Sequence, residues 1–227
     1  RVFAFSQNLD LDQSKEFEKN PEARKGKWNK IVTLKNTPVF NKYNFSNEDN
    51  KLTLTLKDKE IISININNFD ERDDLAKKLI ELESSLKNDI RLMRNDEYPF
   101  YDTSISNKSM FNNSISLINI NSIRDFENKI DRKIEMSTFR GNLYFDGMEA
   151  WEERNWIGKT LKINNVLFKV EKNIPRCVAI NLKPKTDDNS FNLLKILKQT
   201  YDHYDMGVYL TPENDGEINL SEKIHIK

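Results

Sequence analysis

Short segments in which apolar and polar residues alternate recur along this chain and constrain its fold class. The clearest is 52–56, where Leu52, Leu54 and Leu56 alternate with polar residues. A period of two residues is typical of a strand with one buried face. Many short strands with a few helices predict a mainly β fold with helices (α+β), built around a partly closed β-barrel. The further strands are predicted at 30–34, 61–66, 114–120, 139–145, 161–163, 166–170, 178–182, 208–210 and 218–220.

Apolar residues at helical spacing predict three helices. One has Asp70 as its N-cap, and the other two begin at Ser122 and Ser190. The stretch 87–108 is mostly polar and contains Pro99, so we place a division of the chain there. The two parts are expected to be domains of residues 1–105 and 106–227.

The charges of the chain balance, with 36 Lys and Arg against 36 Asp and Glu among 227 residues. A neutral chain has no overall attraction for nucleic acid or anionic lipid, so neither nucleic acid nor a membrane is an expected partner. No apolar run approaches the roughly 20 residues that span a bilayer, and no signal peptide is recognised. We therefore expect a cytoplasmic protein. Because the chain begins at Arg1 rather than at Met, we also expect a segment to precede it.

Cys177 is the only cysteine, which excludes an internal disulfide framework and cysteine-rich zinc or iron–sulfur sites. Free cysteine is most often a small buried hydrophobe. Here it follows Pro175 and Arg176 at a predicted strand start, where a side chain can face a cavity. The charge of Arg176 favours the thiolate, which is a soft metal ligand. One thiolate does not complete a zinc site, so a metal here would arrive with ligands of its own, as part of a cofactor.

A Cys–His nucleophilic pair is the rival interpretation of Cys177. The chain has two histidines, His203 and His225. His225 lies in an alternating tail that predicts an edge strand facing solvent, and His203 follows a predicted helix. Neither has the sequence context of a known protease or transferase.

The segment Phe139-Arg140-Gly141-Asn142 is a candidate anion site. Arg offers a planar, permanently charged fork to phosphate, and Asn offers both a donor and an acceptor. On a strand, Arg140 and Asn142 would point to the same face. Gly141 between them would allow close approach of a ligand or a neighbouring backbone. The alternative is an ordinary strand start with an exposed Arg.

An ordered set of motifs in the second half of the chain resembles one known family. The set comprises FRGNLYFDG (139–147), AWEERNWIG (150–158), the hairpin LKINNVLFKV (161–170) and PRC (175–177). This succession is similar to the MOSC domain, named for molybdenum-cofactor sulfurases, over roughly residues 110–227. The first hundred residues resemble, less distinctly, the smaller N-terminal β-barrel domain that accompanies it, and the two are expected to pack together.

The resemblance implies a molybdenum cofactor (molybdopterin) and reduction of N-hydroxylated compounds by oxygen transfer to the metal. Cys177 matches the cysteine that ligates molybdenum and carries catalysis. The remaining residues match positions that contact the cofactor, and Arg1 matches one that holds its phosphate. A small-molecule substrate and an external electron-donor reductase are implied as partners. Pyridoxal phosphate binding is implied only as a property ascribed to the family. The matching cofactor contacts are Arg140, Asn142, Arg1, Asn113, Ser114 and Arg176.

The chain also departs from the family pattern. A Lys-bearing segment that contacts the phosphate would lie upstream of Arg1. After the cysteine, apolar residues replace hydroxyls and Lys183 replaces an acid. These departures put the substrate side of the pocket in doubt more than the metal ligand. Two alternatives stay open: a non-catalytic carrier of molybdenum cofactor or sulfur, and a β-barrel that binds only partners.

Several conspicuous residues have simpler interpretations. Trp151 and Trp156 are expected to pack beneath the loop 146–158 rather than line a substrate pocket. The acidic pair Glu152-Glu153 is expected on a solvated face. The charged cluster 71–74 is expected to be a helix start and not a metal site.

Overall fold

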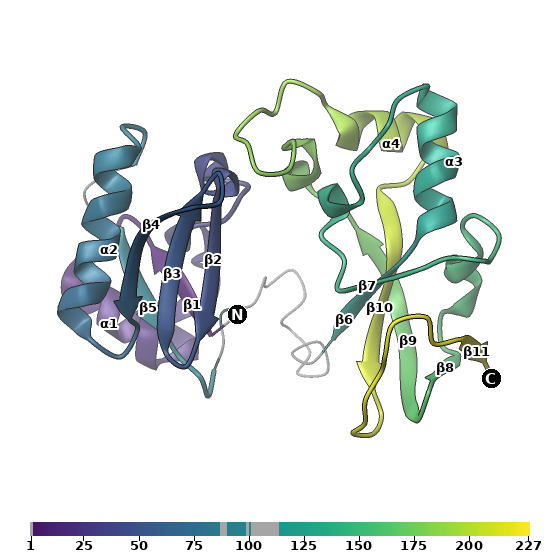
Figure 1. Cartoon of the computed structure of the whole chain (residues 1–227), viewed down its shortest axis with the longest axis horizontal. Helices are drawn as coiled ribbons and strands as arrows, with labels where there is room; N and C mark the ends of the chain where they lie inside the picture. The colour runs from purple at the N-terminus through teal and green to yellow at the C-terminus, as the bar shows by residue number, and fades with distance from the viewer. Residues whose placement is uncertain (1, 87–89, 99, 101–113) are drawn as a thin grey trace. The chain divides into compact units, whose positions relative to one another are not determined.

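The computed structural model describes residues 2–86, 90–98, 100 and 114–227. The chain divides into two compact units (Figure 1). The first comprises residues 1–107 and 185–187, and the second comprises 108–184 and 188–227. That the first unit is the family's companion domain stays a prediction.

The first unit combines two small antiparallel sheets with two helices. Strands β2, β3 and β4 form a three-stranded sheet, and β1 pairs with β5. Leu52 and Leu54 of the clearest alternating segment are buried, as predicted for one strand face, in a cluster that includes Leu75 and Leu79 of α2, whereas Leu56 is partly buried. The elements are β1 (Phe3–Ser6), α1 (Leu11–Lys19), β2 (Tyr43–Glu48), β3 (Lys51–Leu56), β4 (Lys59–Asn65), α2 (Phe69–Leu82) and β5 (Arg91–Arg94), with short 3-10 turns at Pro21–Arg24, Trp28–Lys30 and Pro38–Lys42.

Helix α2 confirms the first predicted helix but begins earlier. Its N-cap is Asn68, whose side-chain oxygen accepts hydrogen bonds from the backbone N–H groups of Asp70 and Glu71 at 3.0 and 3.4 Å. The predicted cap at Asp70 is therefore wrong by two residues. An Asn side chain satisfies the first free N–H groups as well as an Asp does, so both residues are acceptable caps.

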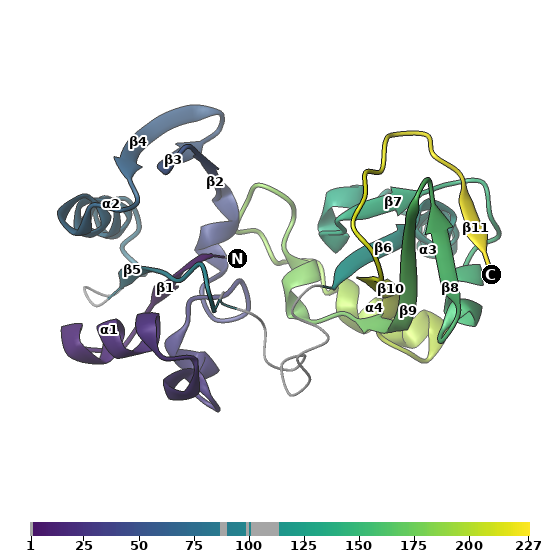
Figure 2. The ribbon, with the colours of Figure 1, turned by 90° about the horizontal axis from the view of Figure 1, so that it is seen from below.

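The second unit is built on one six-stranded sheet of order β11-β8-β9-β10-β6-β7 (Figure 2). The pairings are antiparallel except that of β6 with β7. The sheet is curled like half of a barrel, so the predicted mixture of short strands and a few helices is confirmed. The strands are β6 (Ile115–Asn119), β7 (Leu143–Phe145), β8 (Thr160–Ile163), β9 (Val166–Pro175), β10 (Asp205–Pro212) and β11 (Ile224–Ile226).

Helices α3 (Ile120–Ile130) and α4 (Leu193–Tyr201) pack together at one end of this unit (Figure 1). Phe126 of α3 and Leu197 of α4 share one core cluster with Ile118 of β6 and Met206 of β10. A separate cluster, which includes Leu117, Leu210 and Trp156, covers the other face of the sheet. The sheet therefore has two distinct packed faces. Both helices are capped by Asn, at Asn119 and Asn192, instead of at Ser122 and Ser190.

Three strand predictions in the second unit are wrong. Residues 178–182 form the 3-10 turn Val178–Asn181, because alternation over so few residues also fits a short turn with one buried side. Residues 136–139 form another 3-10 turn, Met136–Phe139, and only Leu143–Phe145 extends as a strand. Residues 218–220 are not a strand, whereas the tail Ile224–Ile226 pairs with β8 at the sheet edge, as expected for His225. The hairpin of β8 and β9 is confirmed, with Asn164 in the left-handed region of its turn.

In the first unit, Lys30–Leu34 was predicted as a strand but contributes only one isolated bridge, between Ile31 and Ser6. Helix α1 and strands β2 and β5 are not predicted by the alternation pattern. Helix α1 buries only Ser14 and Phe17, so its apolar face is too small to show a helical period.

Gly207 provides a test of how tightly β10 packs on β6. Its φ is +79°, and a Cβ there would lie 2.5 Å from the Leu117 carbonyl oxygen and 2.9 Å from Ile118 Cγ1. Gly147 has a similar φ of +88°, but a Cβ there would meet nothing within 4 Å. We predict that Gly147→Ala lowers the free energy of unfolding by about 1 kcal/mol, the strain of the left-handed conformation alone. Gly207→Ala adds a steric clash and should cost more than about 3 kcal/mol. Urea unfolding of both variants measures the difference, and equal costs would contradict this packing.

Candidate functional site

Cys177 lies two residues beyond Pro175, the last residue of β9, and is the N-cap of the turn Val178–Asn181. Its backbone is extended, with φ −121° and ψ 178°, and its carbonyl accepts a hydrogen bond from the Ile180 N–H at 3.1 Å. The side chain is exposed to solvent. The common role of cysteine as a buried hydrophobe is therefore wrong for this residue. Cys177 sits at a strand end, not at a strand start, and its thiol is accessible.

Arg176, the neighbour of Cys177, is held by backbone groups from two other elements. Its backbone N–H donates to the Tyr204 carbonyl at 2.8 Å. Its guanidinium Nε donates to the Met206 carbonyl at 3.0 Å, Nη2 donates to the same carbonyl, and Nη1 donates to the Phe139 carbonyl at 2.8 Å. Arg176 thus joins the end of β9, the start of β10 and the turn Met136–Phe139.

The charge of Arg176 persists despite its burial. Burial lowers the pKa of Arg176 to about 10, because the charged form is desolvated. Among the nearby groups that partly offset this effect is the Cys177 side chain. At neutral pH a cation is therefore present at the residue next to the exposed Cys177. Arg176 was predicted to contact the cofactor, but its guanidinium donates to main-chain carbonyls and so positions the loops around Cys177.

Arg140 is brought towards Cys177 by this arrangement. It follows Phe139, whose carbonyl is bound by Arg176. Arg140 ends the turn Met136–Phe139 in the left-handed conformation, with φ 52° and ψ 42°, and its N–H donates to the Ser137 carbonyl at 3.0 Å. Its side chain is exposed. The expected strand geometry, with the side chains of residues 140 and 142 on one face, is wrong. Arg140 follows Phe139 and Cys177 follows Arg176, and a hydrogen bond joins Phe139 to Arg176.

Asn142 has a fixed orientation. Its Oδ1 accepts hydrogen bonds from the Ser116 backbone N–H at 2.9 Å and from Ser116 Oγ at 2.8 Å. Its own N–H donates to Ser116 Oγ at 2.9 Å. A backbone N–H can only donate, so the side-chain atom that it contacts must be oxygen. The exposed residue therefore keeps its Nδ2 group for another acceptor, since no described residue accepts from it.

Gly141 is required by packing, not by the approach of a ligand. A Cβ there would lie 2.7 Å from Ile118 Cδ1 and 2.9 Å from Tyr144 Cζ. The Gly141 N–H donates to Tyr144 Oη at 2.8 Å, and this hydroxyl donates to the Met136 carbonyl at 3.0 Å. Tyr144 therefore fixes both ends of the bend that carries Arg140.

The remaining predicted contacts are less defined. Ser114 is half-buried, with its hydroxyl 3.4 Å from that of Thr211. Arg1 and Asn113 lie outside the described residues. Two polar residues on the same sheet, Tyr209 and Lys172, are absent from the sequence prediction, because only the pairing of β6, β10 and β9 brings them beside Ser116.

The histidines belong to other environments. His203 Nδ1 accepts a hydrogen bond from the Asp205 N–H at 3.1 Å, and its ring lies against Trp151 and Tyr201. Burial lowers the pKa of His203. His225 is exposed on β11. Among the described residues, neither histidine is hydrogen-bonded to Cys177, and no group of three or more His, Cys, Asp or Glu could hold a metal ion.

Glu153 corrects the expectation of a solvated acidic pair, because it is completely buried. Its carboxylate accepts hydrogen bonds from Asn119 Nδ2 at 3.0 Å and from Ser122 Oγ at 2.9 and 3.1 Å. Burial raises the pKa of Glu153, because desolvation outweighs these hydrogen bonds. The network ties the loop 146–156 to the start of α3. Trp156 is buried in the core, which confirms its predicted packing role, and the half-buried Trp151 donates from Nε1 to Asp125 at 2.7 Å.

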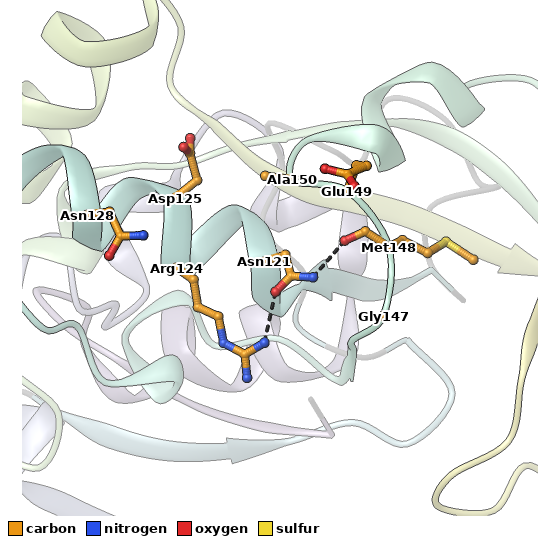
Figure 3. A pocket seen from close by; sticks show the side chains of 8 residues that line it. All are labelled: Asn121, Arg124, Asp125, Asn128, Gly147, Met148, Glu149 and Ala150. Carbon is orange, nitrogen blue, oxygen red and sulfur yellow. Dashed lines mark hydrogen bonds between the residues drawn. The ribbon is translucent and has the colours of Figure 1, made fainter.

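A pocket of about 530 Å³ lies between α3 and the loop 147–150 (Figure 3). Arg124 Nη1 donates to Asn121 Oδ1 at 2.8 Å, and Asn121 Nδ2 donates to the Met148 carbonyl at 2.7 Å (Figure 3). These hydrogen bonds connect the side chains of α3 to the loop 147–150. None of the predicted cofactor residues lines this pocket, so it is separate from the Cys177 surface.

The MOSC domain family model matches residues 102–225, more than half of the chain. The chain therefore belongs to the MOSC domain family. This range contains Cys177, Arg176, Arg140 and Asn142.

Two curated relatives share the name mitochondrial amidoxime reducing component 2. The protein of Rattus norvegicus is 36% identical over 72 residues, which cover 32% of this chain and 21% of that protein. The protein of Bos taurus is 25% identical over 111 residues, which cover 49% of this chain and 32% of that protein. The matched region thus spans a third or less of the length of these relatives.

Among solved structures, the chain is similar to the crystal structure of YiiM from Geobacillus stearothermophilus. The identity is 18% and the TM-score 0.40, over 50% of this chain and 53% of that chain. In the part of the chain that the structure describes, no helix combines the length and the apolar character that a membrane crossing requires.

Arg176→Lys tests the positioning role of the buried guanidinium. A lysine keeps the charge but cannot reach the Met206 and Phe139 carbonyls with a planar fork. One buried carbonyl would lose its donor, so we predict a loss of about 2–3 kcal/mol in the free energy of unfolding. Arg124→Lys, at an exposed pair with Asp146, is the matched control and should change stability little. Urea unfolding measures both, and an Arg176→Lys variant as stable as its control would refute the role.

Glu153→Gln tests the buried carboxyl through pH. Because the pKa of Glu153 is raised in the folded state, its favourable contribution is complete below the ordinary carboxyl pKa. That contribution is lost as the pH rises through the raised pKa. Unfolding curves between about pH 4 and about pH 8 should therefore show the wild type losing stability relative to Glu153→Gln as the pH increases. The neighbouring Glu152→Gln should keep the wild-type profile. Parallel profiles for wild type and Glu153→Gln would show that this carboxyl does not carry the pH dependence.

Proposed function

We propose that this protein binds a molybdenum–pterin cofactor through Cys177 and reduces N-hydroxylated compounds. The family and the names of the two mammalian relatives support an oxidoreductase of this kind. The observation that carries the proposal is the exposed Cys177 thiol, which lies beside a buried cation that also binds the Phe139 carbonyl next to Arg140.

The side chains at the site fit such a cofactor. One accessible thiol is a suitable soft ligand but cannot hold a bare metal ion alone. Described residues offer no cluster that would complete a metal site, so a metal accompanied by its own sulfur ligands is the better match. Arg140 provides an exposed permanent charge for a phosphate, and Asn142 provides a donor whose direction is fixed by Ser116.

Each residue would have a distinct role. Cys177 would be the ligand, Arg140 would neutralise the anionic group, and Asn142 would donate a hydrogen bond from Nδ2. Arg176 would hold Cys177 and Arg140 in register through the Met206 and Phe139 carbonyls. When bound, the cofactor supplies two-electron redox chemistry that cleaves an N–O bond with release of water. Electrons would come from an external reductase, because a single cysteine does not support an iron–sulfur cluster.

The apolar residues after Cys177 bear on the substrate side of the site. Ile180 and Leu182, which stand where hydroxyls occur in relatives, are buried in the structure. Val178 is 43% exposed and adjoins the thiol. The departures from the family pattern therefore fall mainly in the core, and Val178 is the apolar side chain that a substrate would meet.

Cys177→Ser tests the proposal with molybdenum content as the first readout. Expressed in a host that makes the cofactor, the wild-type chain should retain molybdenum, and Cys177→Ser should retain at least about ten-fold less, because the thiolate ligand is lost. Val178→Ala, next to the thiol, should retain the wild-type amount. Elemental analysis of the purified proteins measures this.

The second readout is turnover of an aromatic amidoxime with a chemical reductant. The metal-loaded wild type should reduce it to the amidine, and Cys177→Ser should not. Equal molybdenum in both proteins would exclude Cys177 as the ligand. Molybdenum bound tightly through Cys177 with no reduction would show a carrier in place of an enzyme.

A further inference from the structure

A row of polar side chains crosses the sheet of the second unit. Tyr209 of β10 is paired directly with Ser116 of β6 on one side and with Lys172 of β9 on the other. Directly paired residues of antiparallel strands point to the same face of the sheet. Asn142 extends the row through its bonds to Ser116. We call Asn142, Ser116, Tyr209 and Lys172 the polar row.

The polar row lies on the face opposite one hydrophobic cluster. Leu117 follows Ser116 and Leu210 follows Tyr209 along their strands, and both leucines are buried in that cluster. Neighbouring residues of a strand point to opposite faces, so the row faces away from this cluster. A bulge in β9 makes this possible, because the register shifts between Tyr209 and Leu210 and sets Lys172 opposite Tyr209. Without this shift Lys172 would not share the face of Ser116 and Asn142.

Lys172 is the cation of the polar row. Its side chain is half-buried, and its Nζ lies 5.9 Å from the centre of the Tyr209 ring. A contact of this kind holds a long, flexible side chain over the aromatic face. The lysine stem is therefore directed along the row, towards Tyr209.

Lys172 also has a defined spacing from the thiol. It precedes Cys177 by five residues, of which those up to Pro175 belong to β9, so the two backbones are at most about 18 Å apart. The ends of an elongated ligand can therefore meet two different groups: a thiol at one end and a cation at the other. Asn142 is bonded to Ser116 of β6, which lies on the other side of β10 from Lys172.

We propose that Lys172 is an additional binding residue for the anionic end of the ligand held at Cys177, with Tyr209 positioning its ammonium group. This inference rests on the proposed function and adds a residue that the MOSC-type motifs of the chain do not contain. It assigns the polar row to cofactor binding: Asn142 by donation, Lys172 by charge.

Lys172→Met is the principal variant, because methionine keeps an unbranched apolar stem against Tyr209 and removes the charge. Full-length wild type and variant are purified from a cofactor-producing host and dialysed against increasing salt. Molybdenum is measured by elemental analysis, and the pterin by fluorescence after oxidation. We expect Lys172→Met to retain about ten-fold less of both at moderate ionic strength, since one charge-assisted contact is lost. Lys172→Arg should retain the wild-type amount.

Lys169→Met is the matched control, since it removes the same charge from an exposed lysine on the same strand, farther from Cys177. It should bind like the wild type. Urea unfolding verifies that each variant is folded. If Lys172→Met were unstable, a low retention in a folded Lys172→Gln variant would still support the inference. Equal retention in Lys172→Met, Lys169→Met and wild type would overturn it while leaving the Cys177 ligand in place. A wild type without molybdenum would overturn the proposed function and this inference together.

Discussion

The arrangement around Cys177 depends on the burial of one guanidinium group. Arg176 donates to the carbonyls of Met206 and Phe139, which belong to segments far apart in the sequence. Buried carbonyls need hydrogen-bond donors and a buried cation needs acceptors, so the guanidinium and the two carbonyls satisfy one another. Cys177 follows Arg176 and Arg140 follows Phe139, and both of these neighbours of the bonded pair are exposed to solvent. One structural hydrogen bond therefore fixes the backbone beside both residues to which the proposed function assigns a role.

In the second unit, the proposed binding residues of the polar row lie on the sheet face opposite a large hydrophobic cluster. One face is closed by the cluster that contains Trp156, Leu161 and Leu210. The other carries helices α3 and α4 near one end and the polar row farther along the strands. The buried Glu153 network contributes to stability, because it fastens a loop to the start of α3. None of its hydrogen bonds involves a predicted cofactor residue. Changes to that network should therefore act on folding before they act on binding.

Local patterns predicted part of this molecule well. The hairpins and α2 were accessible because alternation, turn residues and helical spacing act over a few residues. The ordered motifs around Cys177 indicated the family, and the exposed thiol agrees with the role expected from them. The bend at Arg140 could not be predicted from the sequence, because Arg rarely adopts a positive φ and the neighbouring Gly141 is the residue type that favours one.

Long-range geometry accounts for the remaining differences. The burial of Glu153 could not be predicted, because its hydrogen-bond donors lie more than thirty residues earlier in the chain and no local pattern connects them. Lys172 joins the polar row only through a bulge that shifts the strand register. Helix α1 could have been found from its capping box, in which Asp10 and Gln13 exchange hydrogen bonds. The lock between Asn142 and Ser116 has a consequence for selectivity. Because its orientation is fixed by Ser116, the Asn142 amide has its Nδ2 hydrogens, and not its oxygen, left for a ligand. It can therefore donate to a lone pair but cannot accept from an N–H group. In the proposed site, two ligands of equal size would therefore be distinguished by whether the atom that faces this amide accepts or donates a hydrogen bond.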